Sequence, residues 1–460
     1  MLRTHTCGEL NKQHKDQEVT LCGWVHRRRD HGKLIFIDLR DRYGITQIVF
    51  VPSVAPEAHK IAQTLGPEFV VQVRGKVSAR PAGAVNPAIP TGEVELTAAH
   101  LEILNPSLTP VFEIDDTIEP SEELRLAYRY LDLRRSRVLE AFKLRHQLCS
   151  AVRSFLNKEN FLEIETPVLT KSTPEGARDF LVPSRLNPGK FFALPQSPQL
   201  FKQILMVSGV DRYYQIVKCF RDEDLRADRQ PEFTQIDLEM SFAEEEDVFS
   251  LTERMWKEVF RELKGIELKI PFPRLTYAQT MAQYQTDKPD TRTKPEDFAF
   301  VWVVDFHLLK YNKEEKRWES EHHPFTAVQS EDLDLLNKGV WDKVRARSYD
   351  LVLNGSEIGS GSVRIHRKEV QQKIFETIGL SPEEASQRFG FLLKAFEFGA
   401  PPHCGVAYGV DRLVAILCGL DSIRDTIAFP KTQKGSCLLT EAPSGVDSRQ
   451  FKELGLKTSP

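Results

Sequence analysis

A cluster of arginine and acidic side chains near the middle of the chain is the first candidate for chemistry. Residues 220–235 place Arg221 and Arg229 among several carboxylates, with an aromatic residue, Phe233, close behind. A guanidinium fork suits a phosphate group, and a flat ring suits a nucleobase. The segment predicts a nucleoside triphosphate site, with Arg221 at the α-phosphate, Arg229 at a terminal phosphate, Phe233 under the base and Glu223 at its amino group. The alternative is a solvated hairpin with surface ion pairs.

Two further constellations lie downstream and would suit the same ligand. Gly409 precedes an apolar helical run with Arg412 in its first turn, which favours an anion at the helix start. Asp350 and Glu357, together with Ser360, offer the oxygen ligands that Mg²⁺ prefers beside a phosphate. The alternatives are an arginine paired with its neighbour in the helix and acids that only form turns.

Arg364 and a histidine pair are candidates for binding a second, smaller substrate. Small residues surround Arg364 in the run 359–363, so a ligand carboxylate could approach its fork and accept two parallel hydrogen bonds. The alternative is a strand arginine paired with a neighbouring acid. His322 and His323 point to opposite sides of an extended chain, so they are a poor metal pair. One of them is expected to touch substrate, and the other to be structural.

The elements that must position these residues form an α+β unit. Apolar spacing predicts helices over 137–158, 199–208, 245–263, 381–397 and 409–419. Strands are expected at 213–221, 233–242, 301–306, 349–354 and 361–366, with a proline-broken strand at 161–170. Well-separated strands with helices between them predict a mainly antiparallel sheet. A proline-rich and acidic linker at 105–125 precedes this unit, which is expected to span 126–460.

Residues 1–104 predict a separate β domain. Five short apolar runs in about 100 residues are typical of a small Greek-key barrel of the OB type, although another small barrel or sandwich has a similar pattern. Three arginines at 27–29 are expected in a turn, with Phe36 and Gln47 on neighbouring strands. Basic groups, a stacking ring and an amide are what an OB surface uses on single-stranded RNA. The alternative is a solvated turn and a core phenylalanine.

Composition excludes some classes of protein. The net charge of -4 gives no bulk attraction to nucleic acid, so any RNA binding must come from local patches. No apolar run approaches the roughly 18 residues of a membrane span, and the first residues are unlike a signal peptide. Seven cysteines without a Cys-x-x-Cys pair predict reduced thiols in the cytoplasm, without a disulfide framework or a zinc site.

In combination and order, these motifs resemble a class II aminoacyl-tRNA synthetase, and within that class the bacterial-type aspartyl-tRNA synthetases. Residues 161–170 are similar to the first motif of the class, 220–233 to the second and 409–412 to the third. Residues 173–178 and 196–202 and the segment around Arg364 are similar to substrate loops of the aspartate subfamily. The resemblance covers nearly the whole chain.

The resemblance implies a role for each site residue. It implies catalytic roles for Arg221, Arg412 and Glu357. It implies that aspartate is bound by Glu175, Ser197, Gln199, Lys202, Arg221, Asp237, His322 and Arg364. It implies that ATP is bound by Arg221, Asp222, Glu223, Arg229, Gln230, Phe233, Glu357, Gly409, Val410, Asp411 and Arg412. It implies that Mg²⁺ is held by Asp350, Glu357 and Ser360, and that the anticodon is read by Arg29, His31, Phe36, Gln47 and Gly83.

The implied activity is aspartate–tRNA ligation in two steps, through aspartyl-adenylate, by a homodimer acting on tRNA-Asp. Two departures from the family pattern stand out. The insertion domain usual in bacterial members is absent near 286–298, and His31 resembles members that also charge tRNA-Asn. Two rival functions stay open: an RNA-binding protein with an inactive synthetase core, and an asparagine synthetase-like enzyme that uses aspartyl-adenylate to make an amide.

Overall fold

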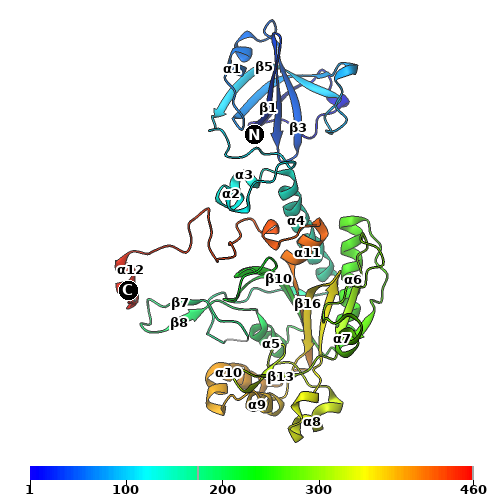
Figure 1. The fold of residues 1–460 in the computed structure, drawn as a ribbon, viewed down its shortest axis with the longest axis vertical. Helices are drawn as coiled ribbons and strands as arrows, with labels where there is room; N and C mark the ends of the chain where they lie inside the picture. Colours follow the sequence, from blue (N-terminus) through cyan, green and yellow to red (C-terminus); the bar gives the residue numbers. More distant parts are fainter. Residues whose placement is uncertain (174–175, 458–460) are drawn as a thin grey trace. The chain divides into compact units, whose positions relative to one another are not determined.

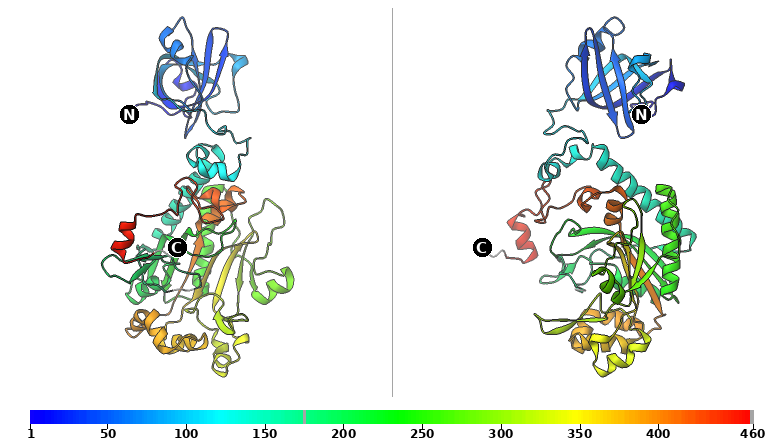
Figure 2. Two further views of the ribbon diagram at one scale, coloured as in Figure 1. Left: turned by 60° about the vertical axis from the view of Figure 1, so that its left-hand side comes forward. Right: turned by 45° about the vertical axis from the view of Figure 1, so that its right-hand side comes forward.

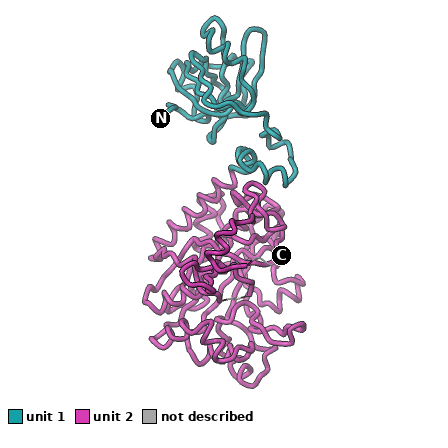
Figure 3. Tube along the Cα trace, turned by 90° about the vertical axis from the view of Figure 1, so that its left-hand side faces the viewer, with its two compact units in different colours: residues 1–139 teal, residues 140–460 magenta. Residues whose placement is uncertain are grey.

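The computed structural model of the chain describes residues 1–173 and 176–457. The chain divides into two compact units, Met1–Leu139 and Glu140–Pro460 (Figure 3). Each unit has its own hydrophobic core. Among the described helices, none is both long enough and apolar enough to cross a membrane. All seven cysteines are free thiols.

The first unit contains a closed barrel of five strands, which confirms the predicted OB-type fold (Figure 1). Its strands follow the order β1-β2-β3-β5-β4, and β1 pairs with β4 to close the barrel. Burial alternates along β1, so Val19, Leu21 and Val25 enter the core while their neighbours face outward. The bounds are β1 (Glu18–His31), β2 (Leu34–Asp41), β3 (Gly44–Phe50), β4 (Val70–Ala79) and β5 (Val94–Asn105), with α1 (Pro56–Ala62) between β3 and β4.

The second unit is built on an eight-stranded sheet with the order β11-β12-β15-β16-β17-β10-β9-β6. Only the pairs at its two edges, β11-β12 and β6-β9, are parallel, which confirms the mainly antiparallel sheet. The bounds are β6 (Leu162–Glu163), β9 (Arg212–Phe220), β10 (Glu232–Ser241), β11 (Arg274–Thr276), β12 (Phe300–Val304), β15 (Ser348–Leu353), β16 (Ser356–Val363) and β17 (His403–Gly409). Two hairpins lie outside this sheet: β7 (Leu181–Pro183) with β8 (Phe191–Ala193), and β13 (Leu309–Asn312) with β14 (Arg317–Ser320).

One face of this sheet is apolar and is covered by three helices, α4 (Ser136–Lys158), α6 (Glu245–Lys264) and α11 (Val410–Cys418) (Figure 2). Helix α6 shows why. Val248, Leu251, Met255 and Val259 recur at helical spacing and are all buried in the core. The helix ends at Gly265, whose φ of 67° is the left-handed conformation that glycine adopts without strain.

The other face of the sheet is polar at its centre. Along β10, Ile236, Leu238 and Met240 join the core, while the alternate side chains, Gln235, Asp237 and Glu239, point to the opposite face. Helix α5 (Gln199–Val207) packs against β9 and β10. The remaining helices are α2 (Glu122–Ala127), α3 (Arg129–Asp132), α7 (Tyr277–Tyr284), α8 (Leu333–Lys338), α9 (Lys368–Thr377), α10 (Pro382–Phe396) and α12 (Ser448–Leu454).

Three local predictions were wrong. The arginines at 27–29 lie inside β1, because the turn to β2 needs only residues 32–33. The predicted strand at 161–170 is reduced to the two residues of β6. The strand predicted at 361–366 begins at Ser356 and ends at Val363.

Candidate active site

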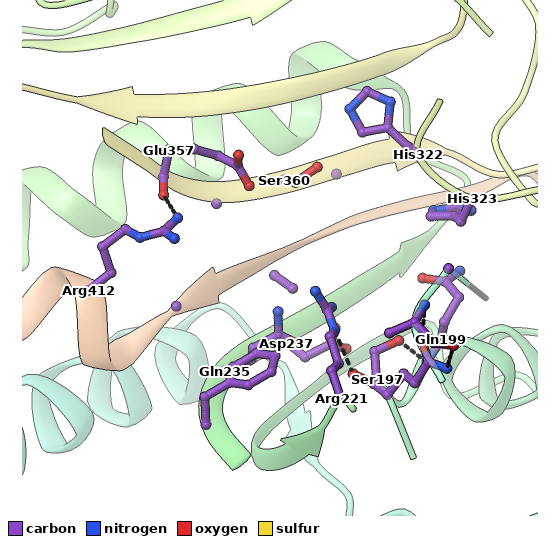
Figure 4. Close-up of a pocket in the computed structure, with 18 of the residues that line it drawn as sticks. Ser197, Gln199, Arg221, Gln235, Asp237, His322, His323, Glu357, Ser360 and Arg412 are labelled. Carbon is purple, nitrogen blue, oxygen red and sulfur yellow. Dashed lines mark hydrogen bonds between the residues drawn. The ribbon is translucent and has the colours of Figure 1, made fainter. Parts of the chain in front are cut away.

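A cleft of about 610 Å³ opens on the polar face of the second unit (Figure 4). Strands β10, β16 and β17 form its floor, and α5 and the loop between β9 and β10 form its sides. It brings together these predicted residues: Ser197, Gln199, Lys202, Arg221, Glu223, Arg229, Gln230, Phe233, Asp237, His322, Glu357, Ser360, Arg364, Gly409, Asp411 and Arg412. Glu175 lies outside the described residues.

Arg364 lies at the buried end of the cleft, and its donors are occupied. Its Nε and Nη2 atoms donate to the two carboxylate oxygens of Glu239 at 2.9 and 3.1 Å. Nη1 donates to Ser362 Oγ at 2.6 Å and to His323 Nε2 at 2.9 Å, and Nη2 also donates to the Gly405 carbonyl at 3.3 Å. A Cβ atom at position 405 would lie 2.1 Å from Glu239 Oε2, so glycine is required there. A substrate carboxylate can bind Arg364 only by replacing one of these partners.

Lys202 joins the same buried group from α5. Its Nζ donates to Asp237 Oδ2 at 2.8 Å and lies 3.2 Å from Glu239 Oε2. Burial raises the pKa of Asp237 to about 6, although Lys202 opposes the shift. Burial acts in the same direction on Glu239, but Arg364 and Lys202 outweigh it and lower the pKa of that carboxyl to about 2. Two cations therefore face two acids, and the group is close to neutral before any ligand binds.

Asp237 keeps one unsatisfied atom. Its Oδ1 is buried and has no hydrogen-bond partner in the part of the chain that the structure describes. A buried acceptor without a partner costs free energy unless a ligand satisfies it. Because Asp237 lines the cleft, Oδ1 is available to a ligand that carries an ammonium group.

The two histidines differ in their charge. Burial and the nearby Arg364 guanidinium hold the pKa of His323 well below its usual range, so this ring is neutral and accepts from Arg364. Burial also lowers the pKa of His322, but Asp350 outweighs it and the net shift is upward. His322 Nε2 lies 3.7 Å from Asp350 Oδ1. The sequence predicted one substrate-facing and one structural histidine, but both rings line the cleft.

Two arginines of the β9–β10 loop, Arg221 and Arg229, line the cleft. Strand β9 ends at Phe220, so Arg221 and Glu223 lie in the loop and not on a strand face. The Arg221 guanidinium carbon lies 5.0 Å from the centre of the Phe233 ring, and Nε donates to the Gln196 carbonyl at 3.4 Å. Among residues 1–173 and 176–457, its two terminal nitrogens have no partner. They are free to bind an anion.

Arg229 and Arg412 line the cleft from two different elements. Arg229 donates to Glu223 Oε2 at 3.4 Å. Arg412, in the first turn of α11, donates to the Glu357 carbonyl (Figure 4). It also donates to Asp228 Oδ2 at 3.2 Å. The segment is therefore a hairpin loop, as one interpretation held, and its cations also line the cleft.

Four other residues that were predicted to bind ATP make contacts within the protein itself. Asp411 accepts from Arg145 of α4 and from the Thr234 amide, and so ties α11 to β10. Gln230 exchanges two hydrogen bonds with the backbone of Lys431, at 2.9 and 2.8 Å. The side chain of Val410 is buried in the core, so it can meet a ligand only through its backbone. Asp222 lies 3.5 Å from the exposed Arg178.

The three predicted metal ligands share one face because β16 bulges. Asp350 pairs with Ser360, but the register shifts so that Val352 pairs with Glu357. The shift puts Glu357 on the same face as Asp350 and Ser360. Within the described residues, no group of three or more His, Cys, Asp or Glu side chains could hold a metal ion. Two carboxylates and a hydroxyl, with the buried Asp350 Oδ1 unsatisfied, fit a Mg²⁺ ion that takes its other ligands from phosphate.

Several residues in the cleft or behind it were not predicted to bind a ligand. Glu239 and Ser362, buried behind the cleft, hold Arg364, and Gln196 in the cleft holds the Ala177 backbone through both its oxygen and its nitrogen. Lys288 lies 3.0 Å from Glu357 Oε2. The only signal available for Glu239 was its place two residues after Asp237 on a strand, which puts both on one face.

In the barrel, four of the predicted RNA-binding residues lie together on the outer face. Arg29 pairs with Phe36 across β1 and β2, and Arg29 Nη2 donates to Gln47 Oε1 at 3.1 Å. The His31 ring lies edge-on to Phe36, with 6.0 Å between ring centres. Gly83 lies in the β4–β5 connection, in the short turn Ala82–Ala84. The face thus combines a cation, an aromatic ring and an amide.

Parts of both units match families of known proteins. Residues 121–433 match the family described as tRNA synthetases class II (D, K and N), and residues 19–104 match an OB-fold nucleic acid binding domain. An aspartate--tRNA(Asp/Asn) ligase from Desulfatibacillum aliphaticivorans is 47% identical over 99% of this chain and 98% of its own length. The corresponding ligase from Oleidesulfovibrio alaskensis is 46% identical over 99% and 95%.

Solved structures agree with the fold. The asparaginyl-tRNA synthetase from Pyrococcus horikoshii, complexed with asparaginyl-adenylate, superposes with a TM-score of 0.76 at 24% identity over 94% of this chain and 99% of that chain. A putative aspartyl-tRNA synthetase from Leishmania major Friedlin gives 0.75 at 20% identity over 93% and 94%. The family model and the two ligases, at 46–47% identity, agree on one family. The chain belongs to the class II tRNA synthetases of the D, K and N group, among the aspartate–tRNA ligases.

Proposed function

We propose that this protein activates L-aspartate with ATP and transfers the aspartyl group to the 3′ end of tRNA-Asp. One observation carries the proposal within the family: a buried, charge-balanced group around Arg364 and Asp237 and the free cation of Arg221 belong to the same cleft, which Arg412 also lines. An amino acid with an anionic side chain fits the first group. A triphosphate fits the arginines.

In the first step the α-carboxylate of aspartate attacks the α-phosphorus of ATP, and pyrophosphate leaves. No proton has to move, so the protein acts by positioning the two substrates and by stabilising charge. Arg221 binds the α-phosphate, while Arg229 and Arg412 bind the outer phosphates. Mg²⁺, held by Asp350, Glu357 and Ser360 with phosphate oxygens, would neutralise charge on the triphosphate. The terminal ribose hydroxyl of tRNA then accepts the aspartyl group, and AMP leaves.

Recognition of aspartate depends on an exchange of partners. The side-chain carboxylate displaces the neutral His323 from Arg364 Nη1 and takes the remaining donor of Lys202. The ammonium group satisfies Asp237 Oδ1, with Ser197, Gln199, Glu175 and His322 near the rest of the substrate. Asparagine would bring an amide in place of the carboxylate and would leave the buried cations without a matching acceptor, which a site of this kind rejects strongly.

The barrel is proposed to read the anticodon through Arg29, His31, Phe36, Gln47 and Gly83. An outward ring beside a cation and an amide is a stacking platform for single-stranded bases. We extend the substrate to tRNA-Asn because His31 fits this pattern and because the relatives named above are Asp/Asn ligases. A homodimer in the cytoplasm is proposed from the family alone.

The domain limits are also proposals: 1–104 for the anticodon domain, 105–125 for the linker and 126–460 for the catalytic domain. The alignment with the Desulfatibacillum relative has 584 positions, so at least 124 of them, 584 less 460, have no residue here. This supports an absent insertion domain. We place the absence near 286–298, where the connection from α7 to β12 is short.

Two assays test the proposal and separate it from its rivals. The first is aspartate-dependent exchange of pyrophosphate into ATP, which we expect without tRNA; its absence would favour an RNA-binding protein with an inactive core. The second is charging of purified tRNA-Asp and tRNA-Asn with aspartate. Exchange without charging of either tRNA would favour the amide-forming enzyme. A background rate with tRNA-Asn alone would limit the substrate to tRNA-Asp.

The affinity for aspartate should fall in acid. Because burial raises the pKa of Asp237 to about 6, this carboxylate gains a proton as the pH falls through that value and can no longer balance the substrate ammonium. We expect the aspartate KM to rise about tenfold for each unit below pH 6. The KM for ATP, measured over the same range, serves as the control, and Asp237→Asn should have a high KM with a flat profile. A flat wild-type profile from pH 5 to 7 would exclude this role.

Phe36→Ala should weaken tRNA binding without affecting amino-acid activation. Loss of one base-stacking ring costs about 1–3 kcal/mol, so the KM for tRNA-Asp should rise about 5- to 150-fold. Pyrophosphate exchange should stay at the wild-type rate, because that step uses no tRNA. Tyr43→Ala is a matched control, since Tyr43 is an exposed ring at the β2–β3 turn of the same barrel. Equal effects from the two variants would contradict the assignment.

A further inference from the structure

The connection between α7 and β12, residues 285–299, is fixed to the β15–β16 turn at both of its ends. Asn354 accepts from the Ala299 amide at 2.8 Å through Oδ1 and donates to the Asp297 carbonyl at 3.0 Å through Nδ2. At the other end, a Cβ atom on Gly355 would lie 3.4 Å from Asp290 Cβ and 3.8 Å from the Lys288 carbonyl. The connection therefore packs directly on the turn that leads into the cleft.

This packing brings one cation into the cleft. Lys288 Nζ lies 3.0 Å from Glu357 Oε2, and the lysine lines the cleft with a side chain that is 41% exposed. A lysine side chain is a cation at neutral pH. Lys294, in the same connection, is exposed and does not line the cleft.

Glu357 is held by two cations from different elements. Arg412 donates to its carbonyl oxygen, and Lys288 pairs with its carboxylate. The carboxylate is one of the two acids that fit Mg²⁺ beside a phosphate. Lys288 is consequently the counter-ion of a metal ligand and stands beside the triphosphate end of the cleft.

We propose that Lys288 is a further ATP-binding residue, one that neutralises Glu357 in the free protein and moves onto the triphosphate when the nucleotide enters with its metal. The inference rests on the proposed function and adds a phosphate ligand to it. A lysine suits such a transfer because its ammonium is a compact charge with three donors on a flexible stem. It can exchange a carboxylate for phosphate oxygens without movement of the backbone.

Calorimetric titration with ATP, without aspartate or tRNA, tests the transfer. Lys288→Met keeps the apolar stem and removes the charge, and Lys294→Met is the matched control on the same connection. At saturating Mg²⁺ we expect Lys288→Met to raise the Kd for ATP about tenfold, the effect of one lost charge-assisted hydrogen bond. The Mg²⁺ concentration that gives half-maximal ATP affinity should fall about threefold or more, because Glu357 no longer has a competing cation.

A Kd for Lys288→Met within twofold of the wild type and of Lys294→Met would overturn the proposal. An unchanged or higher Mg²⁺ midpoint would overturn the transfer from Glu357. If Lys288→Met fails to fold, Lys288→Gln gives the same comparison. Wild-type pyrophosphate exchange is measured separately, so failure of the proposed function would appear there, whereas failure of this inference would appear only as equal ATP binding by the variants.

Discussion

Replacing Arg364 by leucine is expected to abolish aspartate-dependent pyrophosphate exchange while ATP binding persists. The guanidinium is buried, it is the donor proposed to bind the substrate carboxylate, and its removal also leaves Glu239 without its bidentate partner. An uncompensated buried charge costs about 3–5 kcal/mol, so kcat/KM for aspartate should fall about 150- to 5,000-fold. Calorimetry with ATP should give a Kd within threefold of the wild type, because the proposed phosphate contacts belong to Arg221, Arg229 and Arg412 and not to Arg364.

Two companion variants separate lost recognition from lost stability. Arg364→Leu combined with Glu239→Gln removes both charges, so it should recover thermal stability but not activity. Arg347→Leu breaks another arginine–glutamate pair, with Glu245, on a residue that does not line the cleft, and it should keep its exchange activity. If Arg364→Leu activates aspartate at the wild-type rate, the cleft binds the substrate side chain elsewhere.

The parts of the fold with strong periodicity could be predicted from the sequence. Helix α6 was expected at 245–263 and spans Glu245–Lys264, because its apolar residues repeat at helical spacing. The five barrel strands followed from short apolar runs. The prediction of a longer strand at 161–170 was wrong. Its apolar composition is typical of a strand, but Leu162 is exposed and a proline follows, so only two residues pair in β6.

The candidate site was predictable in its residues but not in its pairings. Arg364 and Lys202 were expected to bind a substrate carboxylate, with a pairing of Arg364 with a neighbouring acid as the alternative. The structure places Glu239 and Asp237 against them, across sequence separations of 125 and 35 residues. No local pattern encodes such a contact, since it depends on the order β16-β17-β10 in the sheet. The same limit applies to Lys288, which reaches Glu357 only because Asn354 fixes the connection between α7 and β12.

Arg221→Ala is expected to slow the chemical step far more than it weakens ATP binding. The Phe233 ring and the Gln196 carbonyl hold the guanidinium, and its two terminal nitrogens point into the cleft without partners in the described residues. Charge on the α-phosphate oxygens grows as the carboxylate attacks, so a donor fixed at that point binds the transition state better than ATP. Loss of one such donor costs about 10²–10³ in kcat, whereas the Kd for ATP should change by about threefold or less.

The controls for Arg221→Ala come from the same loop and from the ring that holds it. Arg226→Ala removes an exposed arginine that does not line the cleft, so pyrophosphate exchange should stay at the wild-type rate. Phe233→Leu keeps the charge of Arg221 but removes the ring under it, so its exchange rate should lie between those of Arg221→Ala and the wild type. A kcat for Arg221→Ala within threefold of the wild type would mean that the α-phosphate is bound elsewhere. The unpartnered Arg221 would then be a surface cation, and Arg412 would be the next candidate for the same role.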